Sequence, residues 1–256
     1  MISNRFDVAG KVVVITGGGQ GIGREYALAF AEAAAVPIVA ELDEQNGQRV
    51  VSEIEEKGGE ALAVKTDVTS EEAVRRMVNV TMEKFGRIDI LINNAALFAV
   101  LPKCNFEDIP LDEWSQVLNV NITGSYLCAK IVAPIMRKAG NGRIINVSSG
   151  TVPQGAPGFM HYVTSKAAIV GMTRVMAREL GDDNINVNAV MPGYTETEVE
   201  HASMDDEGRK AIQSMRILKR RGTPDDLIGT VMFLASPASS FITGQSIACC
   251  GGEVML

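Results

Sequence analysis

Tyr162 and Lys166 are the two residues whose types and spacing most directly suggest chemistry. They stand four positions apart in a helical pattern, so both side chains project from the same face. A phenol with a pKa of about 10 is a poor base at neutral pH, whereas a neighbouring ammonium favours the phenolate. That spacing alone is common by chance. Here, however, Ser149 follows an apolar run that reads as a buried strand, at the sheet edge where such folds bind ligands. Together the three side chains indicate acid/base chemistry at a substrate oxygen.

A second candidate site lies near the N-terminus, where the sequence TGGGQGIG occupies residues 16–23. Glycines between a strand and a helix let the backbone approach a pyrophosphate and aim the free N–H groups of the helix at it. The spacing is GxxxGxG rather than GxGxxG. Glu41 ends the next apolar run, and its carboxylate can accept hydrogen bonds from ribose hydroxyls but would repel a 2′-phosphate. Gly18 and Leu42 supply no compensating cation, so NAD is favoured over NADP.

An alternation of short apolar runs and helical patterns must position these residues. The β-branched runs typical of buried parallel strands cover residues 12–16, 38–41, 61–65, 88–92, 143–147, 185–190 and 246–248. Helical patterns cover residues 22–35, 44–57, 70–85, 112–137, 161–180 and 224–234. This order predicts an α/β fold, a single doubly wound Rossmann-type domain whose seven-stranded parallel sheet is flanked by helices. Residues 193–222 interrupt the alternation and are expected to form a small substrate-covering lobe.

Over nearly its whole length the chain resembles the short-chain dehydrogenase/reductase family. The resemblance rests on motifs in a fixed order: Thr16-Gly17-x-x-x-Gly21-x-Gly23, Asp67, Asn93-Asn94-Ala95, Asn121, Ser149, Tyr162, Lys166 and Pro192-Gly193. It departs from the family pattern at Ala96, Glu41 and Cys250, where Gly, Asp and Asp are usual. The family implies hydride transfer between NAD(H) and a secondary alcohol or ketone.

The resemblance also implies roles for individual residues. Tyr162 would exchange a proton with the substrate oxygen, Ser149 would orient that oxygen, Lys166 would lower the tyrosine pKa and hold the nicotinamide ribose, and Asn121 would anchor a water. Ser148 is assigned a structural role. The expected cofactor-binding residues are Gly17, Gln20, Gly21, Ile22, Gly23, Glu41, Asp67, Val68, Asn94, Ala95, Tyr162, Lys166, Pro192, Gly193, Thr195 and Thr197. The expected substrate-binding residues are Leu97, Ser149, Val152, Phe159, Tyr162 and Tyr194.

The segments expected around the reacting atoms suggest the kind of substrate. Residues 95–102 and 150–160 carry no charge, and residues 193–204 carry acidic side chains but no lysine or arginine. A phosphate, carboxylate or coenzyme A tail normally needs a cation or many donors to replace its water. The pattern favours a neutral, largely apolar small-molecule alcohol or ketone, although some of the apolar residues could simply pack the loops.

Composition excludes several other classes of function. The net charge of −7 argues against nucleic acid or an anionic membrane as partner. No apolar run is long enough for a membrane span, and the start of the chain lacks the features of a secretory signal, so a soluble cytoplasmic protein is expected. Four cysteines without ligand spacing and two isolated histidines predict free thiols and no metal.

Two alternatives remain open. One is a 3-oxoacyl-thioester reductase of the same family, which would usually prefer NADP and dock an acidic carrier. The other is a catalytically silent protein that senses NAD or acts as a scaffold, although such proteins typically lose the tyrosine or the lysine. In every case the resemblance predicts a homo-oligomer, most often a tetramer built on the helices at 112–137 and 161–180.

Overall fold

The protein is built on one seven-stranded parallel sheet, in a computed structural model that describes residues 5–256. The strands lie in the order β3-β2-β1-β4-β5-β6-β7, and every pair is parallel. Their bounds are β1 Val12–Thr16, β2 Val36–Glu41, β3 Leu62–Lys65, β4 Ile90–Asn93, β5 Gly142–Val147, β6 Ile185–Pro192 and β7 Ser246–Cys249. The predicted doubly wound, Rossmann-type fold is confirmed, with most strand ends within two residues of expectation.

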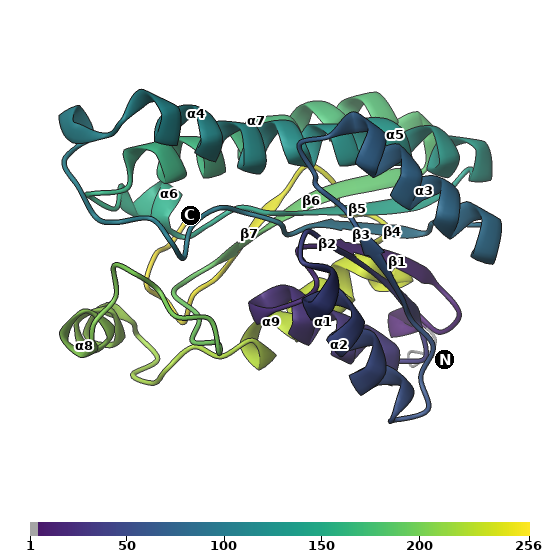
Figure 1. The fold of residues 1–256 in the computed structure, drawn as a ribbon, viewed down its shortest axis with the longest axis horizontal. Helices are drawn as coiled ribbons and strands as arrows, with labels where there is room; N and C mark the ends of the chain where they lie inside the picture. Colours follow the sequence, from purple (N-terminus) through teal and green to yellow (C-terminus); the bar gives the residue numbers. More distant parts are fainter. Residues whose placement is uncertain (1–4) are drawn as a thin grey trace.

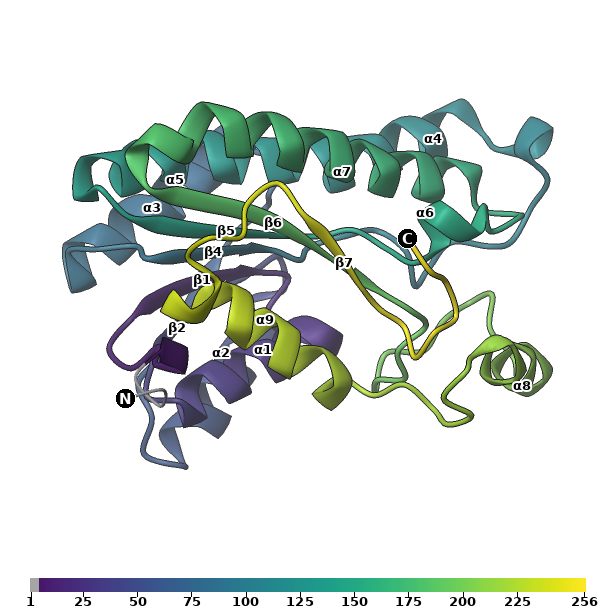
Figure 2. The same cartoon turned by 180° about the vertical axis from the view of Figure 1, so that it is seen from behind.

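Helices cover both faces of the sheet (Figures 1 and 2). One layer contains α3 (Glu71–Phe85), α4 (Leu111–Leu118), α5 (Gly124–Ala139) and α7 (Met160–Leu180), and the opposite layer contains α1 (Gly21–Glu32), α2 (Glu44–Glu55) and α9 (Asp225–Ala235). Successive side chains of a strand point to opposite faces. Val13 and Ile15 of β1 therefore pack with α1, α2 and α9, whereas Val12 and Val14 pack with α3, α5 and α7. Burial on both faces explains why β1 reads as an uninterrupted apolar run.

The long helix expected at 112–137 is interrupted by a π-helical turn. Helix α4 passes into η3 (Asn119–Thr123), which leads directly into α5. Such single π-turns occur often at functional positions, and this one carries Asn121. Helix α5 contains Pro134 and continues beyond it to Ala139.

Two α-helices of the described residues were not expected from the sequence. Helix α6 (Thr151–Gln154) follows β5, and α8 (Asp206–Met215) lies inside the segment of residues 193–222, which we call the lobe. Asp205 begins α8 by accepting a hydrogen bond from the Gly208 amide. Helix α8 stands apart from both helical layers at one end of the molecule (Figure 2). The polar and charged sequence of the lobe follows from this outlying position.

Candidate active site

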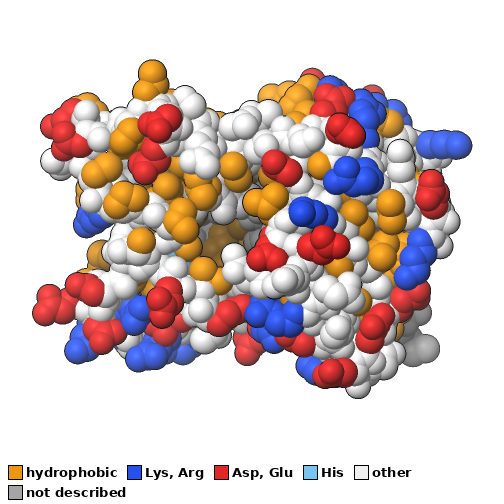
Figure 3. Space-filling view, in the orientation of Figure 1, with side chains coloured by type: hydrophobic (Ala, Val, Ile, Leu, Met, Phe, Trp, Pro, Cys, Tyr) orange, Lys and Arg blue, Asp and Glu red, His pale blue; other side chains and the backbone are white. Residues whose placement is uncertain are grey.

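A cleft of about 580 Å³ opens at the carboxyl ends of the strands, a volume suited to small molecules. It lies where the strand order reverses between β1 and β4, the usual ligand site of open α/β sheets. Apolar side chains gather around a hollow in this region of the surface (Figure 3). Nearly all expected cofactor and substrate residues line it: Gly17, Gln20, Gly21, Ile22, Gly23, Glu41, Asp67, Val68, Asn94, Ala95, Leu97, Ser149, Phe159, Tyr162, Lys166, Pro192, Gly193, Tyr194, Thr195 and Thr197.

Tyr162 lies buried on α7, facing the end of β5. Burial raises the pKa of Tyr162 to about 12, and a hydrogen bond with Ser149 acts in the opposite direction. Ser149 also accepts hydrogen bonds from the amide and hydroxyl of Thr151, at 3.2 and 2.9 Å. The neighbouring Ser148 hydroxyl instead donates to the Lys166 carbonyl at 2.8 Å, which ties β5 to α7. The two adjacent serines therefore have different surroundings, and Ser149 is the one whose hydroxyl acts on the pKa of Tyr162.

Lys166 reaches the same point from one turn further along α7. Its Nζ donates to the Val147 carbonyl at 2.8 Å and lies 5.7 Å from the centre of the Tyr162 ring. Burial lowers the pKa of Lys166 to about 8. At neutral pH the ammonium is thus largely charged, yet it can lose its proton within a modest rise in pH.

Asn121 lies beneath the cleft and is completely buried. Its Oδ1 accepts from the Leu97 amide at 2.7 Å, and its Nδ2 donates to the Ser165 hydroxyl at 2.9 Å. Ser165 in turn donates to the Tyr162 carbonyl at 2.7 Å. Through these bonds the π-turn joins the loop after β4 to the helix that carries Tyr162.

The glycine turn after β1 fits a dinucleotide phosphate. A Cβ atom on Gly23 would lie 2.1 Å from the Gly17 carbonyl oxygen and 2.6 Å from Asn94 Nδ2, so no other residue fits there. Asn94 was expected beneath the adenosine. Its Nδ2 binds the Thr16 and Gly17 carbonyls at 3.0 and 3.1 Å, so it also braces the turn. The turn brings the first amides of α1 to the cleft, as pyrophosphate binding requires.

Glu41 ends β2 at the far side of this turn. Its carboxylate accepts hydrogen bonds from the amides of Gly19, Leu42 and Asp43 at 2.9, 2.8 and 3.2 Å. Arg49 lies nearby on α2 and donates to the Gly19 carbonyl at 3.0 Å. The backbone therefore holds the carboxylate in place beside the turn, where a ribose would bind.

An acidic side chain of the lobe lies at the start of α1. Glu198 Oε1 accepts a hydrogen bond from the Gly21 amide at 2.9 Å, and Thr197 and Val199 lie next to the same glycine. A free amide at a helix N-terminus attracts negative charge. In this arrangement Glu198 holds the donor that a cofactor phosphate would use.

The end of the cleft around Tyr162 is aromatic. Phe98 stacks on Tyr162 with ring centres 4.1 Å apart, and Phe159 and His201 contact the edge of Phe98 at 5.5 and 5.4 Å. His201 also contacts Tyr194 at 5.6 Å. Burial and the nearby Arg209 lower the pKa of His201, which favours the neutral ring.

Sequence reasoning missed several residues of the cleft and misplaced one. His201, Gln154, Ile212 and Glu253 line the cleft, and of these only His201 and Ile212 lie in the segment recognised as a lobe. Val152 does not line the cleft but faces a separate groove against α7. In the short helix α6, Thr151 and Gln154 point to the cleft, so the two residues between them face away.

Comparisons with known proteins agree with this geometry. The family model described as Enoyl-(Acyl carrier protein) reductase matches residues 17–253. The 3-oxoacyl-[acyl-carrier-protein] reductase FabG of Thermotoga maritima is 38% identical over 96% of this chain and 98% of its own. A short-chain type dehydrogenase/reductase from Mycobacterium marinum superposes with a TM-score of 0.92 and 37% identity, covering 100% of both chains. A 7α-hydroxysteroid dehydrogenase in complex with NADH and 7-oxo glycochenodeoxycholic acid gives a TM-score of 0.93 at 33% identity, over 99% of this chain and 98% of that one. The chain therefore belongs to the short-chain dehydrogenase/reductase family, oxidoreductases that act on CH–OH and keto groups with a nicotinamide cofactor.

Proposed function

We propose that the protein transfers a hydride between NAD(H) and a neutral, largely apolar secondary alcohol or ketone. The observation that carries this proposal is the meeting of Tyr162, Ser149 and Lys166 with the glycine turn and Glu41 in one cleft. Such convergence of acid/base groups with a dinucleotide cradle is what hydride transfer to a carbonyl requires. A screen of neutral secondary alcohols with NAD, followed by NADH absorbance, tests it. Absence of turnover across the whole screen would contradict it.

In the proposed mechanism the cleft would hold a nicotinamide cofactor, which would supply the hydride chemistry. Tyr162 donates a proton to the carbonyl oxygen during reduction and accepts one from the hydroxyl during oxidation. Ser149 binds the same oxygen and orients the carbonyl. Lys166 would stabilise the phenolate by its charge and would hold the ribose of a bound nicotinamide nucleotide, and Asn121 would anchor a water that connects Lys166 to solvent.

The preference for NAD over NADP rests on Glu41. A 2′-phosphate on the adenosine ribose would face a buried carboxylate held by three amides. Two like charges about 4 Å apart repel each other by about 1 kcal/mol or more. We expect Glu41→Ala to raise kcat/KM for NADP relative to NAD by about tenfold. Arg49→Gln in that background should reverse part of the gain, because Arg49 is the cation beside Gly19. Equal use of both cofactors by the unmodified enzyme would refute the preference.

Glu198 should compete with the cofactor phosphate. Its carboxylate binds the Gly21 amide, and a charge at a helix N-terminus contributes about 0.3–1 kcal/mol. Glu198→Gln is therefore expected to tighten NADH binding about two- to fivefold in a fluorescence titration. The affinity for ADP-ribose should increase by the same factor, whereas the affinity for adenosine, which has no phosphate, should not change. Glu200→Gln removes the same charge from the same segment and serves as the control. An equal increase in NADH affinity in this control variant would mean that the effect comes from the net charge and not from the contact with Gly21.

The substrate class rests on the lining of the cleft. Phe98, Phe159 and Tyr194 offer apolar surface around Tyr162, and Lys166 is the only lysine or arginine among the lining residues. A flat or cyclic ketone suits this aromatic wall. Matched ketones that differ only by a carboxylate provide the test. A tenfold advantage in kcat/KM for the charged member, about 1.4 kcal/mol, would overturn the assignment.

The similarity to a 3-oxoacyl-[acyl-carrier-protein] reductase favours a second candidate, a thioester-linked 3-oxo substrate. Acetoacetyl-coenzyme A and a neutral 3-oxo ester distinguish the two. If the natural substrate is a thioester, acetoacetyl-coenzyme A should be reduced faster than the neutral ester, and NADPH should be the preferred cofactor. A silent sensor or scaffold would reduce neither compound, yet would still bind NADH.

We also propose a homotetramer. Leu111 on α4, Tyr126 on α5 and Val175 on α7 are 79, 50 and 55% exposed on one helical layer. Exposed apolar side chains on the outer face of a layer suit a symmetric interface between copies. Light scattering should give the mass of four 27.4-kDa chains, and the mass of one chain at micromolar concentration would rule the tetramer out.

Among residues 5–256, no helix is both long and apolar enough to cross a membrane.

A further inference from the structure

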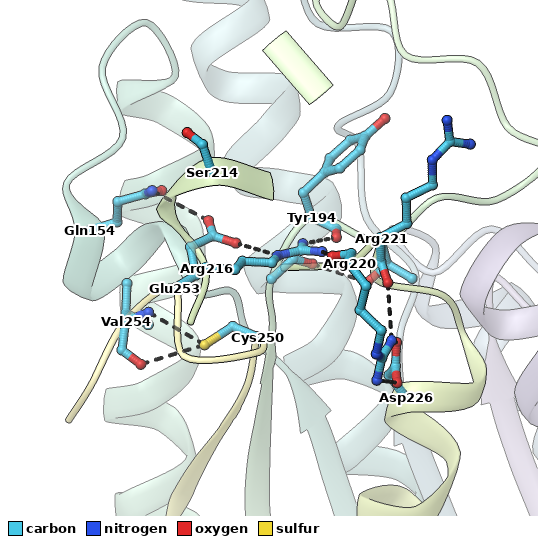
Figure 4. Close-up of polar contacts among 12 residues, drawn as sticks. Gln154, Tyr194, Ser214, Arg216, Arg220, Arg221, Asp226, Cys250, Glu253 and Val254 are labelled. Atoms are coloured by element: carbon cyan, nitrogen blue, oxygen red, sulfur yellow. Dashed lines mark hydrogen bonds and ion pairs between the residues drawn. The ribbon is translucent and has the colours of Figure 1, made fainter. Parts of the chain in front are cut away.

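A buried ion pair joins the lobe to the C-terminal end of the chain. Arg216, which follows α8, donates from Nε to Glu253 Oε2 at 3.3 Å, and the two side chains are 5 and 6% exposed (Figure 4). Every other lysine or arginine paired with a carboxylate between residues 5 and 256 has at least one partner that is 28% exposed or more. The Arg216–Glu253 pair is thus set apart by its burial.

The guanidinium of Arg216 connects three segments of the chain. Besides Glu253, it donates from Nη2 to the Tyr194 carbonyl and from Nη1 to the Arg220 carbonyl, the latter at 3.3 Å (Figure 4). The Gly251 carbonyl accepts from the two amides that follow Arg216, at 3.0 and 2.9 Å. Both ends of the lobe and the turn after β7 therefore meet on one side chain.

The pair connects to the wall of the cleft through Glu253 itself and through Tyr194, whose carbonyl Arg216 binds. Tyr194 lines the cleft, and its ring contacts His201, which contacts Phe98 on the face of Tyr162. Glu253 also lines the cleft, and its Oε1 accepts from Gln154 Nε2 at 3.3 Å. A shift at Arg216 would consequently move the aromatic surface against which a substrate packs.

Stability alone does not account for such a pair. Desolvation of two buried charges largely cancels their attraction, and apolar replacements of similar volume are often neutral or stabilising. We propose that Arg216 and Glu253 are positioning residues that hold Tyr194 and the lobe against the substrate end of the cleft. This inference depends on the proposed function only because it takes the aromatic end of the cleft to be the place where the substrate binds.

The test compares single and double replacements. Arg216→Met alone leaves a buried carboxylate unpaired and should lower the melting temperature, whereas Arg216→Met/Glu253→Leu should recover it. Positioning predicts that the double variant still has a substrate KM raised about tenfold, with kcat and the Kd for NADH each within about threefold of wild type. Arg220→Gln is the matched control, because Arg220 lies in the same lobe but pairs with Asp226 on the surface.

Hydrogen exchange supplies a readout that needs no turnover. In the double variant, amides of residues 193–204 should exchange about tenfold faster while those of β1 to β6 stay unchanged. Wild-type KM and wild-type exchange in a stable double variant would overturn the proposal. If the unmodified protein reduced no ketone at all, that result would contradict the proposed function. The hydrogen-exchange result would then decide by itself whether Arg216 and Glu253 position the lobe.

Arg216→Lys provides a second variant if the double variant does not fold. It keeps the charge beside Glu253, but a single ammonium cannot hold the Tyr194 and Arg220 carbonyls as the planar guanidinium does. In this variant the substrate KM should rise about threefold, and amide hydrogen exchange of residues 193–204 should also become about threefold faster. Wild-type values for both would overturn the proposal.

Discussion

Tyr162→Phe should remove almost all turnover while leaving NADH binding within about twofold of wild type. The phenyl ring can keep its stacking on Phe98, so only the hydroxyl is lost, and general acid/base catalysis contributes about 10² to 10⁴-fold. Initial rates of ketone reduction and an NADH fluorescence titration measure the two effects. Tyr126→Phe, on the exposed side of α5, is the matched control and should keep its activity. Wild-type rates in the Tyr162 variant would defeat the proposed chemistry.

The same residue sets the expected dependence on pH. Burial raises the pKa of Tyr162 to about 12, so the phenol is protonated at neutral pH and can give its proton to a ketone. Alcohol oxidation needs the phenolate, whose fraction grows as pH rises toward the pKa. We therefore expect kcat/KM for oxidation to increase from about pH 6 to pH 9. The pKa of Lys166, lowered to about 8, falls in this window, so the measured profile belongs to the pair.

Lys166→Ala should damage both catalysis and cofactor binding. Its ammonium lies beside the Tyr162 ring and faces the cleft, where it would favour the phenolate and bind the ribose. Turnover is expected to fall about 10²-fold and the Kd for NADH to rise about tenfold. Lys130→Ala, a surface lysine paired with Glu71, controls for loss of positive charge. An unchanged NADH affinity would contradict the second role of Lys166, even if turnover were lost.

The order of secondary structure could be predicted because local rules agree with the global fold. β1 is buried on both faces, so its apolar run needs no tertiary information to be recognised. Asp43 and Ser70 cap α2 and α3 where their sequences suggest helix starts. Tyr162, Lys166 and Ser149 could be placed for the same reason: helical spacing and a strand end fix them relative to their own elements.

What the sequence could not predict depends on contacts between distant segments. The π-turn at Asn121 is stabilised by Leu97 and Ser165, which lie far away in the chain. The carboxylate of Glu198 meets Gly21 across 177 positions, and no local pattern encodes that approach.

The end of the chain shows the same limit. Cys250 stands where the family usually has an acid, and its Sγ lies 3.5 Å from the Val254 amide nitrogen in the turn that brings Glu253 to Arg216. The fold and the positions of Tyr162, Lys166 and Ser149 on their elements follow from the sequence alone, because periodicity and spacing are properties of single elements. The lobe and C-terminal side chains that complete the cleft became known only from the three-dimensional structure, because their positions depend on how loops pack across the edge of the sheet.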